Sequence, residues 1–257
     1  MKYLNDVNYK DCVGKICKSK SSGDFKVLKY KDWANVEIQF LNTGYETVTR
    51  FDHIRNGLIK DPHVPSVYGV GVLGTKHPIT INGVQTKEYG LWVRMLKRCY
   101  SEGYKKKHQT YKDCEVSENF KFYEYFYEWC NEQFGFGIED FELDKDLLIK
   151  GNKIYSESTC IFIPYEINLL LTKCTASRGE YLIGVCWDKA KNAFKAQVSM
   201  SKGKREYLGL FTTELEAFNA YKVAKETFVK EQANKFKSQI DPRAYNALMN
   251  YEVSTDD

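Results

Sequence analysis

The stretch that decides the fold reads FKAQVSM at residues 194–200 and REYLGLF at residues 205–211. Apolar side chains occupy every second position of residues 194–200, and polar side chains fill the positions between them. This period is typical of a strand with one packed face and one solvent-exposed face. Together with the residues before it, the pattern predicts three short strands over residues 181–211.

The last of these strands divides its side chains between the two faces of the sheet. The alternation predicts that Leu208 and Leu210 meet a helix, while Arg205 and Tyr207 point the opposite way. The helix that covers the packed face is expected next along the chain.

That helix is predicted over residues 213–236. Thr213 is a favourable N-cap, and Glu216 lies three residues further on, as a capping box requires. Apolar residues then recur at steps of three or four and predict one stripe that covers the sheet. The stripe consists of Leu215, Phe218, Tyr221, Ala224 and Phe228.

The polar groups of this region predict a surface that contacts nucleic acid. Residues 173–237 hold thirteen Lys or Arg and seven Asp or Glu, whereas the whole chain has a net charge of +4. Cationic, amide and hydroxyl groups suit phosphates and base edges. A lysine-rich surface that only keeps the protein in solution is the alternative. The predicted DNA-binding residues of the region are Arg178, Lys189, Lys191, Lys195, Gln197, Ser199, Lys202, Lys204, Arg205 and Tyr207.

The region resembles the APETALA or ethylene-response-factor type of DNA-binding domain. The resemblance rests on Gly184-Val185, Phe194, Ala196, residues 207–211, Glu216-Ala217 and Ala220-Tyr221. It implies a three-stranded sheet that is backed by one helix and lays its open face in the major groove of double-stranded DNA. It also implies that Arg205 and Tyr207 occupy the family's arginine and tryptophan positions, and Gln197 its glutamate position. The chain departs from the family at Cys186 and Ser199, where arginines are usual.

The composition of the 257 residues predicts a folded α+β protein with ample core material, since 43% of the residues are apolar. The sequence contains no run of eighteen apolar residues, and no apolar leader follows Met1. We therefore expect a soluble, cytoplasmic protein with no membrane partner. The eight cysteines include no CxxC pair, which favours reduced thiols and no zinc. A metal cluster of Cys99, Cys114 and Cys160 stays open as an alternative, and the sequence leaves the oligomeric state unknown.

Three domains are expected, at residues 1–74, 75–172 and 173–257. The first is predicted to be β-rich, with strands over residues 24–30, 36–40 and 46–51. It is interpreted either as a second nucleic-acid-binding unit or as a scaffold or oligomerisation domain.

The middle block, residues 75–172, opens with two predicted helices, at residues 88–100 and 120–134. The aromatic side chains of the second helix favour a core over a base-stacking platform. Between the helices, a basic loop of Lys105, Lys106 and Lys107 is placed to contact a phosphate backbone.

Residues 143–168 predict a strand, a Gly-Asn turn, a second strand and the start of a helix. With the helices before it, this order resembles the HNH-type proteins common in bacteriophage genomes, many of which end in an APETALA-like module. The resemblance covers about residues 80–250. It rests on Trp92, Arg98-Cys99, Leu143-Asp144-Lys145-Asp146, Gly151-Asn152, Tyr155-Ser156, Cys160, Pro164 and Asn168.

The resemblance implies a Mg or Mn site that acts on DNA. Asp144 falls on the family's metal-ligand Asp, Lys145 on its general-base His, Thr159 or a neighbour on its metal-binding Asn, and Asn168 on its last Asn. A protonated lysine is a poor base at neutral pH. Three oxygen-bearing residues nearby, Asp146, Asn152 and Glu157, are candidates to rebuild the site. The alternative is a salt-bridged turn at residues 144–146 in a fold that has lost cleavage.

Two functions therefore compete at this stage. The first is a sequence-directed DNA endonuclease or nickase of the phage HNH type that depends on a divalent metal. The second is a DNA-binding regulator or anti-host factor on a degenerate HNH scaffold. A protein-interaction module that never meets nucleic acid is a third interpretation.

Overall fold

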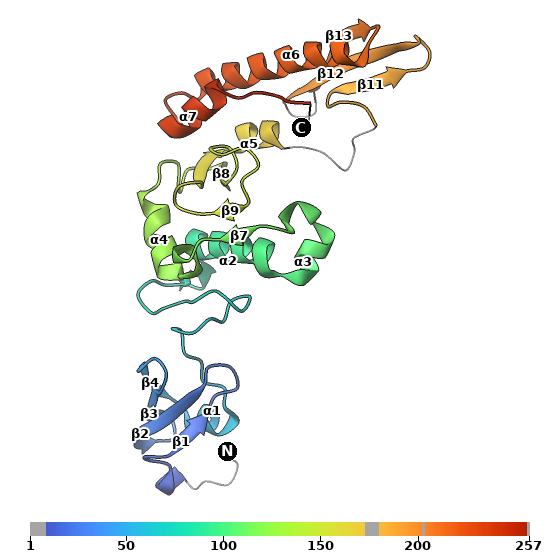
Figure 1. Ribbon diagram of the computed structural model, residues 1–257. Coiled ribbons are helices and arrows are strands. Elements are labelled where there is room, and N and C mark those ends of the chain that lie inside the picture. Colours follow the sequence, from blue (N-terminus) through green and yellow to red (C-terminus); the bar gives the residue numbers. More distant parts are fainter. Residues whose placement is uncertain (1–8, 173–179, 202–203, 256–257) are drawn as a thin grey trace. The chain divides into compact units, whose positions relative to one another are not determined.

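The computed structural model describes residues 9–172, 180–201 and 204–255 (Figure 1). It confirms the predicted α+β class, with several small antiparallel sheets and separate helices. Contacts within the chain group the residues up to Glu128 into one compact unit and those from Trp129 onward into another. The three-domain division at residues 74 and 172 stays a prediction.

The first unit begins with a four-stranded antiparallel sheet in the order β1-β2-β3-β4. Alternate residues of β2 and β3 are buried, so Phe25, Val27, Val36 and Ile38 form the core on which the following helix packs. The three predicted strands are present, but the third ends at Thr49, because Phe51 begins the helix. The three-residue strand β1 was missed because it is too short to show a period. The elements are β1 (Ile16–Lys18), β2 (Asp24–Asp32), β3 (Asn35–Phe40), β4 (Glu46–Thr49) and α1 (Phe51–Asn56).

The rest of the first unit is mainly helical. The basic loop predicted at residues 105–107 is instead part of a helix that begins after Ser101. The Ser101 hydroxyl accepts from the backbone N–H of Tyr104 and caps this short helix, so residues 105–107 are helical and not a loop. The predicted second helix starts later than expected, at Tyr123, after a 3₁₀ turn. The elements are β5 (Thr80–Ile81), β6 (Val84–Gln85), α2 (Lys87–Tyr100), α3 (Glu102–Lys107), η3 (Gln109–Tyr111), β7 (Glu115–Val116), η4 (Asn119–Lys121) and α4 (Tyr123–Glu132).

The second unit contains the segment predicted over residues 143–168. Strand β8 (Phe141–Asp144) pairs antiparallel with β10 (Ile161–Pro164), and α5 (Tyr165–Leu171) follows directly. The long loop between β8 and β10 carries the two-residue strand β9 (Ile154–Tyr155). The predicted order of strand, turn, strand and helix is confirmed.

The C-terminal part is the predicted three-stranded sheet backed by a helix (Figure 1). Strands β11 (Val185–Asp188), β12 (Ala193–Ser201) and β13 (Lys204–Phe211) are antiparallel, and α6 (Glu214–Lys235) packs on them. The capping box is present: Thr213 Oγ1 accepts from Glu216 N at 3.2 Å, and Glu216 Oε2 accepts from Thr213 N at 3.0 Å. Helix α7 (Pro242–Met249) completes the unit.

A β-bulge in β13 overturns the prediction for Leu210. Ala196 pairs with Gly209 but Gln197 pairs with Tyr207, so Leu208 has no partner across the sheet. Leu208 packs against the helix-side core as predicted. Beyond the bulge the alternation is reversed, and Leu210 pairs with Lys195 and is 39% exposed.

Helix α6 is shared by two hydrophobic cores. Near its N-terminus Phe218 and Tyr221 pack with Val198 of the sheet, and towards its C-terminus Val229 and Ala233 pack with residues of β10, α5 and α7. Leu215, expected in the apolar stripe, is instead 57% exposed. The helix thus joins the sheet and the β8–β10 segment into one unit.

The packing of Tyr221 of α6 next to Gly184, just before β11, requires a residue without a side chain at position 184. The φ of Gly184 is +79°, and a Cβ built there would overlap the ring of Tyr221. We expect Gly184→Ala to lower the free energy of unfolding by about 2 kcal/mol or more, through backbone strain and overpacking. Urea denaturation of the two proteins measures the difference.

Gly103→Ala is the matched control, because Gly103 lies in α3 with a negative φ and no atom within 4 Å of the position that a Cβ would take. It should leave stability unchanged or raise it by up to about 1 kcal/mol. Equal effects of the two substitutions would contradict the packing argument at Gly184.

Candidate nucleic-acid interface and acidic turn

The face of the β11–β13 sheet that α6 does not cover gathers most of the predicted DNA-binding side chains. Ala196 and Val198 point to the helix side and are fully buried. The alternate residues of β12 therefore lie on the opposite face. Cross-strand pairing adds their partners, since paired residues share a face: Cys186 and Leu210 lie beside Lys195, Tyr207 beside Gln197, and Arg205 beside Ser199. We call this surface, formed by Cys186, Lys195, Gln197, Ser199, Arg205, Tyr207 and Leu210, the open sheet face.

The open sheet face combines positive charge with accessible ring and amide groups. Tyr207 is 59% exposed, and Arg205 and Ser199 are exposed as well. The one acid of residues 205–211, Glu206, pairs with Val198 and so belongs to the other face. At the turn between β11 and β12, the carboxylate of Asp188 accepts from the backbone N–H groups of Ala190 and Lys191.

The remaining predicted contacts lie around this face or outside the described residues. Lys189 and Lys191 occupy the exposed turn between β11 and β12. Arg178 and Lys202 lie outside the described residues, and so does the side chain of Lys204, which begins β13. The pairing register also places Cys186 on the open sheet face, at a position where the resembled family usually has an arginine. Sequence reasoning missed Leu210 as a member of this face, because the bulge brings it there.

The second candidate site is a turn that follows β8, the acidic turn of residues 144–152. Asp144 is buried, and its Oδ1 accepts from the backbone N–H of Asp146 at 3.0 Å and of Leu147 at 2.8 Å. Burial, and then the nearby carboxyl of Asp146, raise the pKa of Asp144 to about 6.

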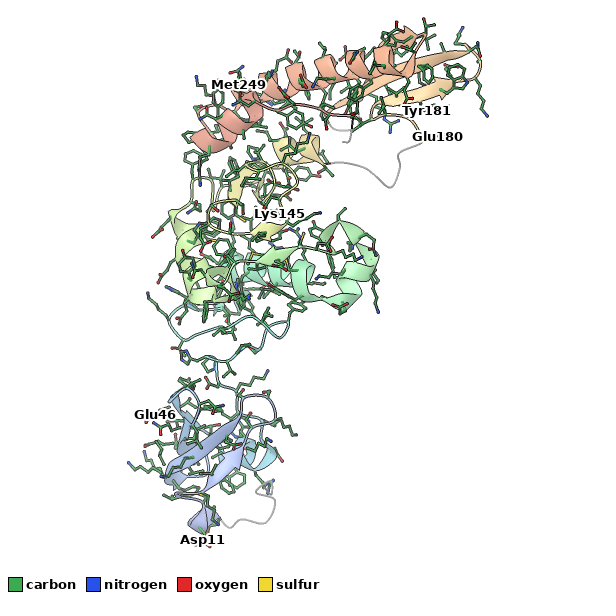
Figure 2. All side chains as sticks on the ribbon, viewed as in Figure 1. Asp11, Glu46, Lys145, Glu180, Tyr181 and Met249 are labelled. Carbon is green, nitrogen blue, oxygen red and sulfur yellow. The ribbon has the colours of Figure 1, made fainter. Side chains whose placement is uncertain are left out.

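Lys145 closes this turn and is itself buried (labelled in Figure 2). Its Nζ donates to the backbone carbonyl of Asn152 at 2.9 Å and to Asp146 Oδ2 at 3.2 Å. The side chain of Asn152 also bonds to Lys145, because its Nδ2 donates to the backbone carbonyls of Lys145 and Ile154, each at 2.7 Å. The structure thus brings together Asp144, Lys145, Asp146 and Asn152 of the predicted site.

The other two predicted site residues have different partners. The hydroxyl of Thr159 donates to the carbonyl of Ile154 at 2.7 Å and accepts from Ser156 N at 3.1 Å. Asn168, on α5, donates through Nδ2 to Glu142 Oε2 at 2.6 Å. Both side chains therefore serve local structure in this arrangement.

These contacts decide whether the residues fit a divalent cation. Asp144 and Asp146 supply carboxylates of the kind that magnesium prefers. The carbonyl of Asn152 and one oxygen of Asp146 are, however, already bound by the ammonium of Lys145, and the Thr159 hydroxyl is bound to the backbone. Over the described ranges, no group of three or more His, Cys, Asp or Glu side chains is arranged to hold a metal. A divalent cation held by Asp144 and Asp146 would therefore need further ligands from outside the predicted set.

Comparison with family models, with curated proteins and with solved structures gives no match. No disulfide joins the cysteines in the described part of the chain, and all of these cysteines but Cys186 are buried. Among the described residues, no helix is long and apolar enough to cross a membrane.

The raised pKa of Asp144 predicts a pH-dependent stability. Below pH 3.8 the carboxyl is neutral in the folded and unfolded states, and above pH 6 it is charged in both. Between these values the folded state holds a proton that the unfolded state has lost, so the stability contributed by the group falls as pH rises. Asp144→Asn removes the buried charge and keeps the acceptor for Asp146 N and Leu147 N. We expect it to raise the free energy of unfolding at pH 7 by about 2 to 3 kcal/mol.

Urea denaturation of both proteins at several pH values between 4 and 7 checks this expectation. The gain should shrink as pH falls towards 4. Asp113→Asn, which neutralises an exposed carboxyl, is the matched control and should change stability little at any pH. A gain for Asp144→Asn that does not vary with pH would contradict the assignment.

Proposed function

We propose that the protein binds double-stranded DNA with the open sheet face. The observation that carries the proposal is the cross-strand cluster of Lys195, Gln197, Ser199, Arg205 and Tyr207 on the one face of the sheet that α6 leaves uncovered. The major groove is wide enough to admit β-strands, and its base edges present donors and acceptors to such side chains. The resemblance to the APETALA type of domain supports the same orientation.

The side chains divide between two tasks. Lys189, Lys191 and Lys195 carry charges that suit phosphate oxygens, which give affinity and fix orientation. Gln197 and Arg205 have the paired donor or donor–acceptor geometry that reads adenine and guanine edges. We assign sequence choice to these two residues and to the ring of Tyr207.

Single substitutions on the open sheet face test the proposal. Arg205→Ala should weaken binding to a selected duplex about 5- to 150-fold, which corresponds to about 1 to 3 kcal/mol for a bidentate base contact. Tyr207→Ala should also weaken binding, while Leu215→Ala, on the exposed side of α6, should leave it unchanged. Fluorescence anisotropy with duplexes selected from a random pool gives the affinities. Unchanged affinity for both face variants would overturn the proposal.

A second candidate function is sequence-directed DNA cleavage or nicking by an HNH-type site with Mg or Mn. One observation favours it: Asp144 is buried as a carboxyl at a cost in stability, although an asparagine would accept the same two backbone hydrogen bonds. A buried carboxyl with a raised pKa is typical of a site with a chemical role. The engaged Lys145 favours the alternative, a DNA-binding regulator or anti-host factor that does not cleave. In either case we propose a location in the cytoplasm.

Incubation of the full chain and a bound duplex with Mg²⁺ or Mn²⁺ distinguishes the nuclease from the regulator that does not cleave. For the nuclease, strand cleavage should appear on a denaturing gel, and Asp144→Asn should lower its rate at least about 100-fold while leaving duplex affinity unchanged. Asp113→Asn is the control for removal of a carboxyl elsewhere. Absence of cleavage with either ion on a duplex that the protein demonstrably binds would leave the regulator.

A further inference from the structure

A second basic surface lies on the first unit, on elements that the open sheet face does not include. Residues 94–112 contain seven Lys or Arg and a single acid, Glu102. They belong to the second half of α2, to α3 and to η3. We call the exposed cations of this stretch the α2–α3 basic surface. It consists of Arg94, Lys97, Lys106, Lys107 and Lys112, with the half-buried Lys105 beside them.

The charges of the α2–α3 basic surface are not neutralised by the described part of the chain. No carboxylate of that part lies within ion-pair distance of Lys97, Lys105, Lys106, Lys107 or Lys112. Elsewhere in the same unit, lysines such as Lys29, Lys76 and Lys121 do pair with glutamates. The surface therefore presents uncompensated positive charge.

Aromatic rings lie against one cation of this surface, Lys97, and against its neighbour Arg98. Lys97 Nζ lies 5.6 Å from the ring centre of Tyr104, and the guanidinium of Arg98 lies 5.5 Å from that of Tyr111. Tyr104 also stacks on His108 with the ring centres 4.3 Å apart. Side chains braced in this way lose less freedom when they bind, which favours a surface that binds over one that only solvates.

We propose that the α2–α3 basic surface is a second contact to the phosphate backbone of the duplex that the open sheet face binds. This inference rests on the proposed DNA binding and adds a sequence-independent contact from the other compact unit. A duplex is favoured as the partner because it presents closely spaced negative charges along its whole length. Two linked contacts raise the overall affinity through effective concentration without any new base recognition.

The test uses the full chain with Lys105, Lys106 and Lys107 all changed to Gln. The matched control changes Lys20, Lys26 and Lys60, three exposed lysines of the N-terminal sheet region, to Gln, so that the net charge falls equally. Affinity for the selected duplex and for an unrelated duplex is measured across a series of salt concentrations, from low to above physiological ionic strength. Thermal melting confirms that both variants fold.

The α2–α3 variant should bind both duplexes at least about ten-fold more weakly, and the slope of log affinity against log salt should lessen by about 1 for each phosphate that the protein no longer binds. The control variant should keep the wild-type slope. Equal effects in the two variants would show that the loss of affinity is not specific to the α2–α3 basic surface and would overturn the inference. So would an unchanged slope in the α2–α3 variant.

Two further outcomes distinguish a second DNA contact from DNA binding by the open sheet face alone and from binding of an acidic polypeptide. If Arg205→Ala weakens binding while the α2–α3 variant does not, the open sheet face stands and only the second contact is rejected. If the α2–α3 variant binds DNA normally but no longer binds polyglutamate as the wild type does, the surface serves an acidic polypeptide and the inference is again overturned.

Discussion

The burial of α6 in two cores is the interaction on which the C-terminal half of the molecule depends. One end of the helix packs on β11–β13 and the other on β10, α5 and α7, so neither core is complete without it. Between the cores the buried Lys225 donates from Nζ to the carbonyl of Leu170, at the end of α5, at 2.7 Å. Burial lowers the pKa of Lys225, because the ammonium is removed from water.

The packing of α6 on one face of the β11–β13 sheet stabilises the strands that carry the open sheet face. A three-stranded sheet is marginal in water unless one face is packed, and α6 supplies that packing through Phe218 and Tyr221. The opposite face then carries mainly polar and cationic side chains, with Cys186 and Leu210 beside Lys195, at the fixed spacing of the strands. Positions on rigid strands are more exact than positions on loops, which suits the reading of base edges.

The sequence predicts the parts of the fold that local physics determines and misses those set by register or by tertiary packing. The capping box at Thr213 and the alternation of residues 194–200 are local, and both are confirmed. The bulge at Leu208 is not, because a single strand cannot show which partner residue it faces, and so Leu210 was placed on the wrong side. In the candidate site, adjacency in sequence grouped Asp144, Lys145, Asp146 and Asn152 correctly, whereas the roles of Thr159 and Asn168 depend on hydrogen bonds to Ile154 and Glu142.

In the acidic turn, the ammonium group of Lys145 is the cation that bonds to the nearby oxygen atoms. Two carboxyls, of Asp144 and Asp146, lie close enough for one to raise the pKa of the other, and the ammonium of Lys145 bonds to Asp146 and to the Asn152 carbonyl. A lysine in this position supplies positive charge without a bound ion, so the turn is held together by its own side chains. The open sheet face shares no residue with the turn. The proposed DNA binding by that face and the proposed cleavage at the turn are therefore two separate proposals.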